Sequence, residues 1–155
     1  MSGATRHFFR TVTDLEAAVG RSLGTTEWLT LDQCTVSRFA TLTGDDQWIH
    51  VDVERATSSP FGGTIVHGYL TLSLLPAFAA SLYSVEAGSA RLNYGVDKVR
   101  FPSPLAVGAR IRASPTITRV RRTPAGAQVF VRWVVEADGN DRPVCVAETI
   151  TLVVG

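Results

Sequence analysis

The stretch that decides the fold is Ile65–Val85, which reads IVHGYLTLSLLPAFAASLYSV. It carries no Lys, Arg, Asp or Glu, but His67, Pro76 and several Ser and Thr residues interrupt its apolar runs. A membrane-spanning helix needs about 20 predominantly apolar residues, so these interruptions argue against a membrane span. A helix without a charged face must instead be buried on nearly all sides. We therefore predict a long central helix surrounded by a sheet.

The second half of the chain supplies that sheet. Four stretches are rich in Val, Ile, Thr and aromatic residues, and several of them alternate apolar with polar positions. They are Arg91–Arg100, Arg110–Val120, Gln128–Ala137 and Val144–Val153. Turn residues lie between them, as in the sequence DGND at 138–141. This pattern predicts an antiparallel meander.

The first half mixes short helices with one strand. Thr13–Glu16 fits a capping box that opens a helix, and Thr26–Leu31 has the composition of a strand. Asp32 and Asp52 each stand where they can cap a further helix. A chain of 155 residues has the length of one domain. We therefore expect residues 1–155 to form a single α+β domain.

Composition narrows the functional classes. Fifteen basic and fourteen acidic residues leave a net charge of +1, which does not indicate a nucleic-acid partner. Cys34 and Cys145 lie far apart and match neither a metal-binding pattern nor a disulfide scaffold. The N-terminal sequence has no apolar core typical of a secretory signal. We expect a cytoplasmic protein that does not associate with membranes.

Two titratable residues mark a candidate active site. Asp45 follows Gly44, where a helix is expected to end, and His50 comes five residues later across a turn that contains Trp48. A carboxylate and an imidazole on one tight loop can share a water molecule and act as a general acid–base pair. Trp48 can lower the local polarity around them. The alternative is structural, with Asp45 binding backbone N–H groups and His50 packed in the core.

A second feature favours catalysis. His67 and Gly68 stand at the expected start of the central helix, shortly after Phe61-Gly62-Gly63. A helix N-terminus presents free N–H groups and a partial positive charge. Glycine lets the oxygen of a ligand come close to the backbone, so this region can stabilise an oxyanion. Such glycines also serve simple turns, and the argument depends on the upstream Asp–His pair.

These motifs resemble a known family. The sequence GDDQWIHVD at 44–52, followed by FGGTIVHGYLTLSLLP at 61–76, is similar to the hydratase motif of the MaoC-like dehydratases, which include the (R)-specific enoyl-CoA hydratases. The similarity continues through NYGVDKVRFPSPLAVG at 93–108 and covers roughly Trp28 to the C-terminus.

The resemblance implies a hot-dog fold, in which an antiparallel sheet wraps a long helix and two such sheets join in a homodimer. It also implies hydration of a trans-2-enoyl-CoA to an (R)-3-hydroxyacyl-CoA, and the reverse dehydration. By motif position, Asp45 and His50 activate water, and the N–H of Gly68 is the oxyanion donor. Coenzyme A would be part of the substrate, and no cofactor is implied.

Further residues are expected to line the substrate site, with packing or structural roles as the alternative for His67, Asn93 and Tyr94. They are Gln47, Trp48, Gly63, His67, Asn93 and Tyr94.

Two positions depart from the family pattern. Gln47 stands where Asn is common, and Pro76 stands in the long helix where some relatives have serine. A proline at that position should kink the helix.

Other interpretations carry less weight. His50, Asp52 and His67 are the residue types of a two-histidine, one-carboxylate metal site, but their spacing follows no metal-binding rule, so we predict no metal. An acyl-CoA thioesterase, or a non-catalytic acyl-binding subunit of a heterodimeric dehydratase, is the alternative function. Arg119, Arg121 and Arg122 form a basic cluster that either meets the phosphates of coenzyme A or protects an edge strand.

Overall fold

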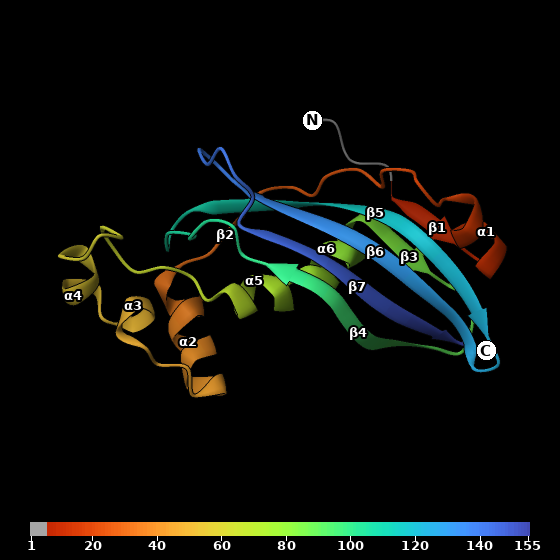
Figure 1. Cartoon of the computed structure of the whole chain (residues 1–155), viewed down its shortest axis with the longest axis horizontal. Coiled ribbons are helices and arrows are strands. Elements are labelled where there is room, and N and C mark those ends of the chain that lie inside the picture. The colour runs from red at the N-terminus through yellow and green to blue at the C-terminus, as the bar shows by residue number, and fades with distance from the viewer. Residues whose placement is uncertain (1–5) are drawn as a thin grey trace.

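The computed structural model describes residues 6–155. Its central element is a five-stranded antiparallel sheet in the order β2-β5-β6-β7-β4 (Figure 1). The strands span Leu29–Thr30 (β2), Ala90–Arg100 (β4), Arg110–Thr123 (β5), Gly126–Ala137 (β6) and Cys145–Val154 (β7). The four long strands confirm the predicted ones to within a few residues. The predicted strand Thr26–Leu31 is wrong in extent, because only two of its residues pair.

The predicted meander is correct for β5, β6 and β7 but wrong for β4. This strand precedes β5 in the chain, yet it pairs with the far side of β7. Along β6, alternate side chains point into the core, and Val131, Trp133 and Val135 are buried there. The two-residue connection from β5 ends at Gly126, where a Cβ atom would lie 2.0 Å from the carbonyl oxygen of Val153. Only glycine fits that close approach.

The predicted single helix over Ile65–Val85 is wrong in two respects. It is two helices, Gly68–Ser73 (α5) and Leu75–Leu82 (α6), and Pro76 lies in the first turn of the second. Proline has no N–H to donate, so it is tolerated where a helix restarts but not inside one. The last three residues, Tyr83–Val85, form a strand (β3) that pairs in parallel with His7–Phe9 (β1).

The two helices cover the inner face of the sheet, but they are not enclosed by it (Figure 1). Leu75, Phe78 and Leu82 point into the core and are buried. Tyr69 and Pro76, on the opposite side, are exposed in the single chain. The expected burial on nearly all sides is therefore wrong for one chain, because the sheet covers only one side of the helices.

Short helices complete the N-terminal half. The first, Val12–Ala17 (α1), begins with a capping box between Thr11 and Asp14, two residues earlier than predicted. The others are Gln33–Thr43 (α2), Trp48–Val51 (α3) and Val53–Thr57 (α4), which together extend beyond one end of the sheet (Figure 1). Asp32 caps α2 and Asp52 caps α4, as predicted.

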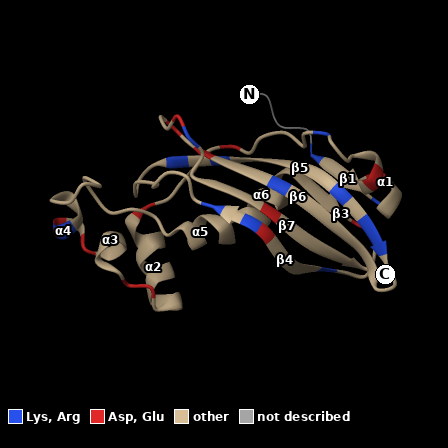
Figure 2. Cartoon of the chain, in the orientation of Figure 1, with Lys and Arg blue, Asp and Glu red and all other residues tan. Residues whose placement is uncertain are grey.

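Charged residues of both signs are spread over the strands (Figure 2). The five arginines of β5 all have partners within the chain. Arg110, Arg112 and Arg122 pair with acidic side chains, Arg121 donates to Gln128, and Arg119 lies over the ring of Phe130. This favours the structural interpretation of the basic cluster. Among the described residues, no helix is long and apolar enough to cross a membrane.

Candidate active site

The end of α2 places Asp45. Gly44 closes the helix in the left-handed conformation, with φ of 76°, and its N–H donates to the carbonyl of Ala40 at 2.8 Å. The chain then turns sharply, and the next residue, Asp45, leaves the helix with an exposed side chain. The helix end therefore directs a solvent-accessible carboxylate toward the segment that follows.

His50 is held more firmly. It lies in the single turn of α3 and is only 7% exposed. Its Nδ1 lies 2.7 Å from the carbonyl oxygen of Ile65. A carbonyl can only accept, so Nδ1 carries the hydrogen and Nε2 keeps a free lone pair. The ring is thus oriented by the backbone with one nitrogen available for proton exchange.

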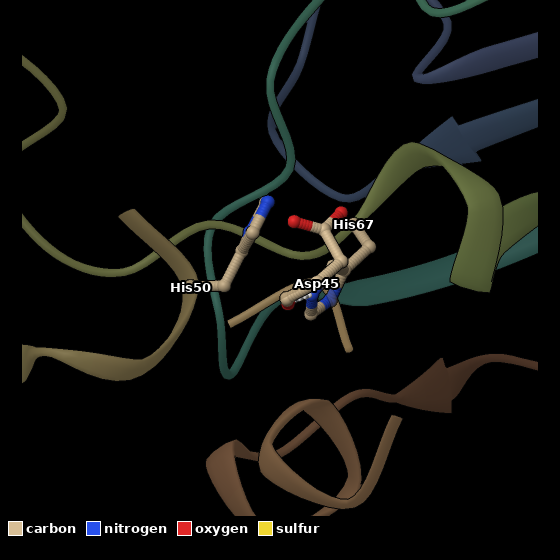
Figure 3. Close-up of side chains that lie close together, drawn as sticks. All are labelled: Asp45, His50 and His67. Atoms are coloured by element: carbon tan, nitrogen blue, oxygen red, sulfur yellow. Dashed lines mark hydrogen bonds between the residues drawn. The ribbon is translucent and has the colours of Figure 1, made fainter. Parts of the chain in front are cut away.

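Asp45 and His50 converge, as the hypothesis of an acid–base pair requires. Together with His67 they each offer one polar side-chain atom, and these atoms all lie within 4.8 Å of one another. Figure 3 shows the carboxylate of Asp45 and the tip of the His50 ring pointing toward the same space. A water molecule between these two groups can lose a proton to one of them while the other exchanges a proton with a bound substrate.

His67 contacts both residues. It is the N-cap residue of α5 and is 2% exposed. Its Nε2 lies 2.8 Å from the backbone carbonyl oxygen of Asp45, and its ring stacks on that of His50, with 3.7 Å between the centroids and 23° between the planes. Its Nδ1 is buried and has no hydrogen-bond partner within residues 6–155.

Gly68 follows as the first residue of α5. The first hydrogen bonds of this helix are donated by Leu70 and Thr71 to the carbonyl of His67. The N–H of Gly68 therefore has no partner within the helix. A Cβ atom at this position would lie 2.7 Å from the ring of Phe101, so any larger residue would have to displace that ring.

The sequence analysis did not identify the side chain of Gln33, at the start of α2, which also helps to hold His50 in place. Its Nε2 donates to the carbonyl of His50 at 2.8 Å, and its Oε1 accepts from the hydroxyl of Thr64 at 2.6 Å. Gln33 thereby ties α3 to the segment that leads into α5. No local pattern marks a glutamine at a helix start as a tertiary contact, which explains why it was missed.

The remaining predicted substrate residues are dispersed. Gln47 is exposed and accepts the N–H of His50 with its carbonyl at 2.9 Å. Trp48 lies beside the pair in sequence, and the guanidinium of Arg55 covers its ring at 4.3 Å. Gly63 lies in the loop before α5. These three residues stay on the lobe formed by α2, α3 and α4.

Asn93 and Tyr94 lie on β4, on the other side of α6. Asn93 lines a cavity of about 670 Å³ between α6 and the inner face of the sheet, whereas Tyr94 is 60% exposed and does not line it. A register shift between Asn93 and Gly95 accompanies this difference. Asp45, His50 and Gly68 do not line this cavity in the single chain.

The carboxylate that lies near His50 and His67 is that of Asp45, not that of Asp52 as considered from the sequence. Asp45 joins His50 and His67, whereas Asp52 uses its carboxylate to accept the N–H of Arg55 at 3.0 Å. Each histidine already donates one ring nitrogen to a backbone carbonyl, and metal-binding histidines often do so too. The three side chains are ligand types for a divalent cation, but stacked rings direct their in-plane lone pairs side by side rather than toward one ion, so the geometry suits the acid–base pair better.

Comparisons with known proteins agree with this fold. Residues 14–138 match the family model described as MaoC like domain. The chain is 47% identical over 143 residues to 3-hydroxyacyl-thioester dehydratase Z of Mycobacterium tuberculosis, covering 92% of this chain and 95% of that protein.

Two solved structures share the fold. The (R)-hydratase from A. caviae superposes with a TM-score of 0.71 at 21% identity, over 87% of this chain and 96% of that one. A 3R-hydroxyacyl-ACP dehydratase complex from Mycobacterium tuberculosis gives a TM-score of 0.69 at 16% identity, over 87% of this chain and 96% of that one.

The protein is thus a hot-dog-fold hydro-lyase, which adds water to a double bond or removes it. More particularly, the chain belongs to the family of MaoC-like dehydratases.

Proposed function

We propose that this protein hydrates trans-2-enoyl-CoA thioesters to (R)-3-hydroxyacyl-CoA and catalyses the reverse dehydration. One observation carries the proposal. The carboxylate of Asp45 and the imidazole of His50 converge on one space, and the bond from Nδ1 of His50 to Ile65 leaves Nε2 free to exchange a proton. This arrangement suits a reaction that takes one proton from water and delivers one to carbon.

In the hydration direction, the oxygen of water bonds to C3 of the enoyl group while the C2–C3 double bond breaks. Asp45 and His50 together take one proton from water and return one to C2, so no net proton is gained or lost. Negative charge develops on the thioester oxygen, and the N–H of Gly68 is the donor that stabilises it. Asp45, His50 and Gly68 are the catalytic residues in this proposal.

The reaction needs no redox cofactor, because the addition of water transfers no electrons to an acceptor. Coenzyme A enters as part of the substrate. The apolar space along α6, including the cavity lined by Asn93, suits the acyl chain. In this proposal no metal is required.

We also propose that the protein works as a homodimer. Strand β4 forms one edge of the sheet, and its side chains Leu92, Tyr94 and Val96 are exposed. Tyr69 and Phe101, beside the start of α5, are exposed as well and contact each other edge to face at 6.1 Å. Exposed apolar side chains on a long edge strand are an aggregation hazard unless another chain covers them. A second copy of this chain would cover them.

The experiment that tests the function follows two signals from one reaction. Hydration of crotonyl-CoA removes the absorbance of its conjugated double bond, whereas thioester hydrolysis releases a free thiol. We expect loss of absorbance without release of thiol. Thiol release would instead identify a thioesterase. If the purified protein had no turnover but gained it on addition of a second chain, the partner-subunit interpretation would hold and the proposal would fail.

A further inference from the structure

We propose that His67 is a positioning residue that fixes both members of the catalytic pair relative to each other. The proposal depends on the function proposed above, because it assigns a role in that same reaction. His67 is not expected to exchange protons with the substrate. It acts through Asp45, whose backbone it holds, and through His50, whose ring it supports.

The first contact holds Asp45. This residue is exposed and lies on the turn after α2. Its own N–H reaches the hydroxyl of Thr43 only at 3.4 Å, near the limit for a hydrogen bond. Its carbonyl, by contrast, accepts from the buried Nε2 of His67 at 2.8 Å. The bond to His67 therefore ties this turn to the interior.

The second contact holds His50. The two imidazole rings are stacked, with 3.7 Å between their centroids. The ring of His67 also packs edge to face with the ring of Phe39, with 5.1 Å between the ring centroids. Phe39 belongs to α2, His50 to α3, and His67 precedes α5. One buried ring thus joins the three helices that deliver the acid–base pair.

The orphan nitrogen supports this assignment. Because the carbonyl of Asp45 can only accept, Nε2 of His67 carries the hydrogen, and Nδ1 has no partner within residues 6–155. Burying an unpaired polar atom costs free energy that a purely packing residue would avoid. A leucine or phenylalanine would fill the space without this cost. The site therefore retains histidine for its combination of a flat ring and a directed N–H.

Two variants separate the two contacts. Phenylalanine at position 67 keeps a ring against His50 but cannot donate to the carbonyl of Asp45. Glutamine keeps a donor near the place of Nε2 but has no ring. A displacement of about 1 Å in a catalytic group costs roughly 100-fold in rate. We expect His67→Phe to lower kcat for crotonyl-CoA hydration by about that factor and His67→Gln by about 10-fold, with KM nearly unchanged.

Stability provides the control, because a buried substitution can lower activity by unfolding. Val135 is fully buried on β6, far from the pair in sequence and outside the cavity lining. Val135→Ala should lower the thermal midpoint of unfolding but leave kcat near the wild-type value. If His67→Phe and Val135→Ala lost activity in the same proportion to their lost stability, the positioning role would be refuted.

A second measurement does not depend on activity. The ring of His67 shifts the NMR signal of the His50 Cε1–H through its ring current. We expect His67→Gln to remove this ring-current shift and His67→Phe to keep a shift in the same direction. An unmoved signal in His67→Gln would overturn the proposal. If the two variants changed the His50 signal as expected but wild-type protein did not hydrate enoyl-CoA, the proposed function would fail while the geometry assigned to His67 remained.

Discussion

Nδ1 of His50 donates to the carbonyl oxygen of Ile65 at 2.7 Å, and this single bond determines which ring nitrogen is free for chemistry. The N–H of Ile65 in turn donates to the carbonyl of Ile49 at 2.9 Å. The segment that leads into α5 is therefore bonded to α3 on both sides of the catalytic ring. A backbone carbonyl, rather than a carboxylate, thus determines the tautomer of His50.

Asp45→Asn and His50→Gln should each reduce hydration of crotonyl-CoA by about 100-fold to 10,000-fold, the range that general acid–base groups contribute. Both substitutions conserve size, so the cooperative unfolding transition should remain. Asp46→Asn is the matched control, because Asp46 is exposed and adjacent to Asp45. Near-normal turnover in Asp45→Asn and His50→Gln would contradict the assignment.

Gly68→Ala should disturb the start of α5. The added methyl group would lie 2.7 Å from the ring of Phe101, which is 39% exposed and can turn outward. We expect a loss of about 1 kcal/mol in the free energy of unfolding, at the low end for overpacking. Urea denaturation measures this loss, and Phe101→Leu in the same chain should recover most of it. A full loss that persists in the double variant would mean that the contact with Phe101 is not the cause.

Removal of divalent metal should leave hydration unchanged, because in the proposed reaction Asp45 and His50 act directly on water. Dialysis against EDTA followed by the crotonyl-CoA assay measures this. Added Zn²⁺ should inhibit instead, since it can bind the carboxylate of Asp45 and the free Nε2 of His50. Activity that disappears with EDTA and returns with a divalent ion would show that these residues hold a catalytic metal.

If the proposed dimer forms through β4, negative charges introduced on this edge strand should separate the two copies. In a two-fold interface the same surface of both copies is in contact. Glutamates introduced on β4 of one copy would therefore lie close to the same glutamates on β4 of the other copy. Leu92→Glu combined with Val96→Glu should lower the mass measured by light scattering from twice 16.7 kDa to 16.7 kDa. Val19→Glu, at an exposed apolar position in the turn after α1, is the control that should stay dimeric. A wild-type protein that is already monomeric would refute the dimer.

The two cysteines should differ in reactivity. Cys34 is exposed, whereas Cys145 is buried, and burial raises the pKa of its thiol from 9.0 to about 11. Since the thiolate is the reactive form, a thiol reagent at pH 8 should modify one thiol in the folded protein and two after unfolding. Two equivalents in the folded protein would contradict the burial of Cys145.

The same raised pKa has a consequence for stability. The folded protein holds the proton of Cys145 more tightly than the unfolded chain does. Stability from this group is therefore fully present below pH 9 and declines as the pH rises from about 9 toward about 11. A Cys145→Ala variant should lack this part of the pH dependence.

The sequence was sufficient for the four long strands and for the caps at Asp32 and Asp52. Their signals are local, because alternation and capping depend on residues close together in the chain. The convergence of Asp45 with His50 was also predictable, since only five residues separate them. The family assignment was confirmed because the motif around these residues is specific.

The missed features depend on distant contacts. The pairing of β4 with β7, the short parallel pair of β1 and β3, and the clamp of Gln33 all join segments that the chain keeps apart. The break between α5 and α6 was only half anticipated, because Pro76 was expected to kink one helix rather than to start a second. The role of His67 depends on the direction of one ring, which no spacing rule determines.

The position of β7 has a consequence for how the protein reaches its native state. This strand is made after all the others, yet it lies between β6 and β4 and supplies the hydrogen bonds that hold them together. While the ribosome is still extending the chain, β4 has no neighbour to pair with and its apolar side chains stay uncovered. The sheet therefore closes in a late step, and chaperones that shield nascent chains would protect β4 during that interval.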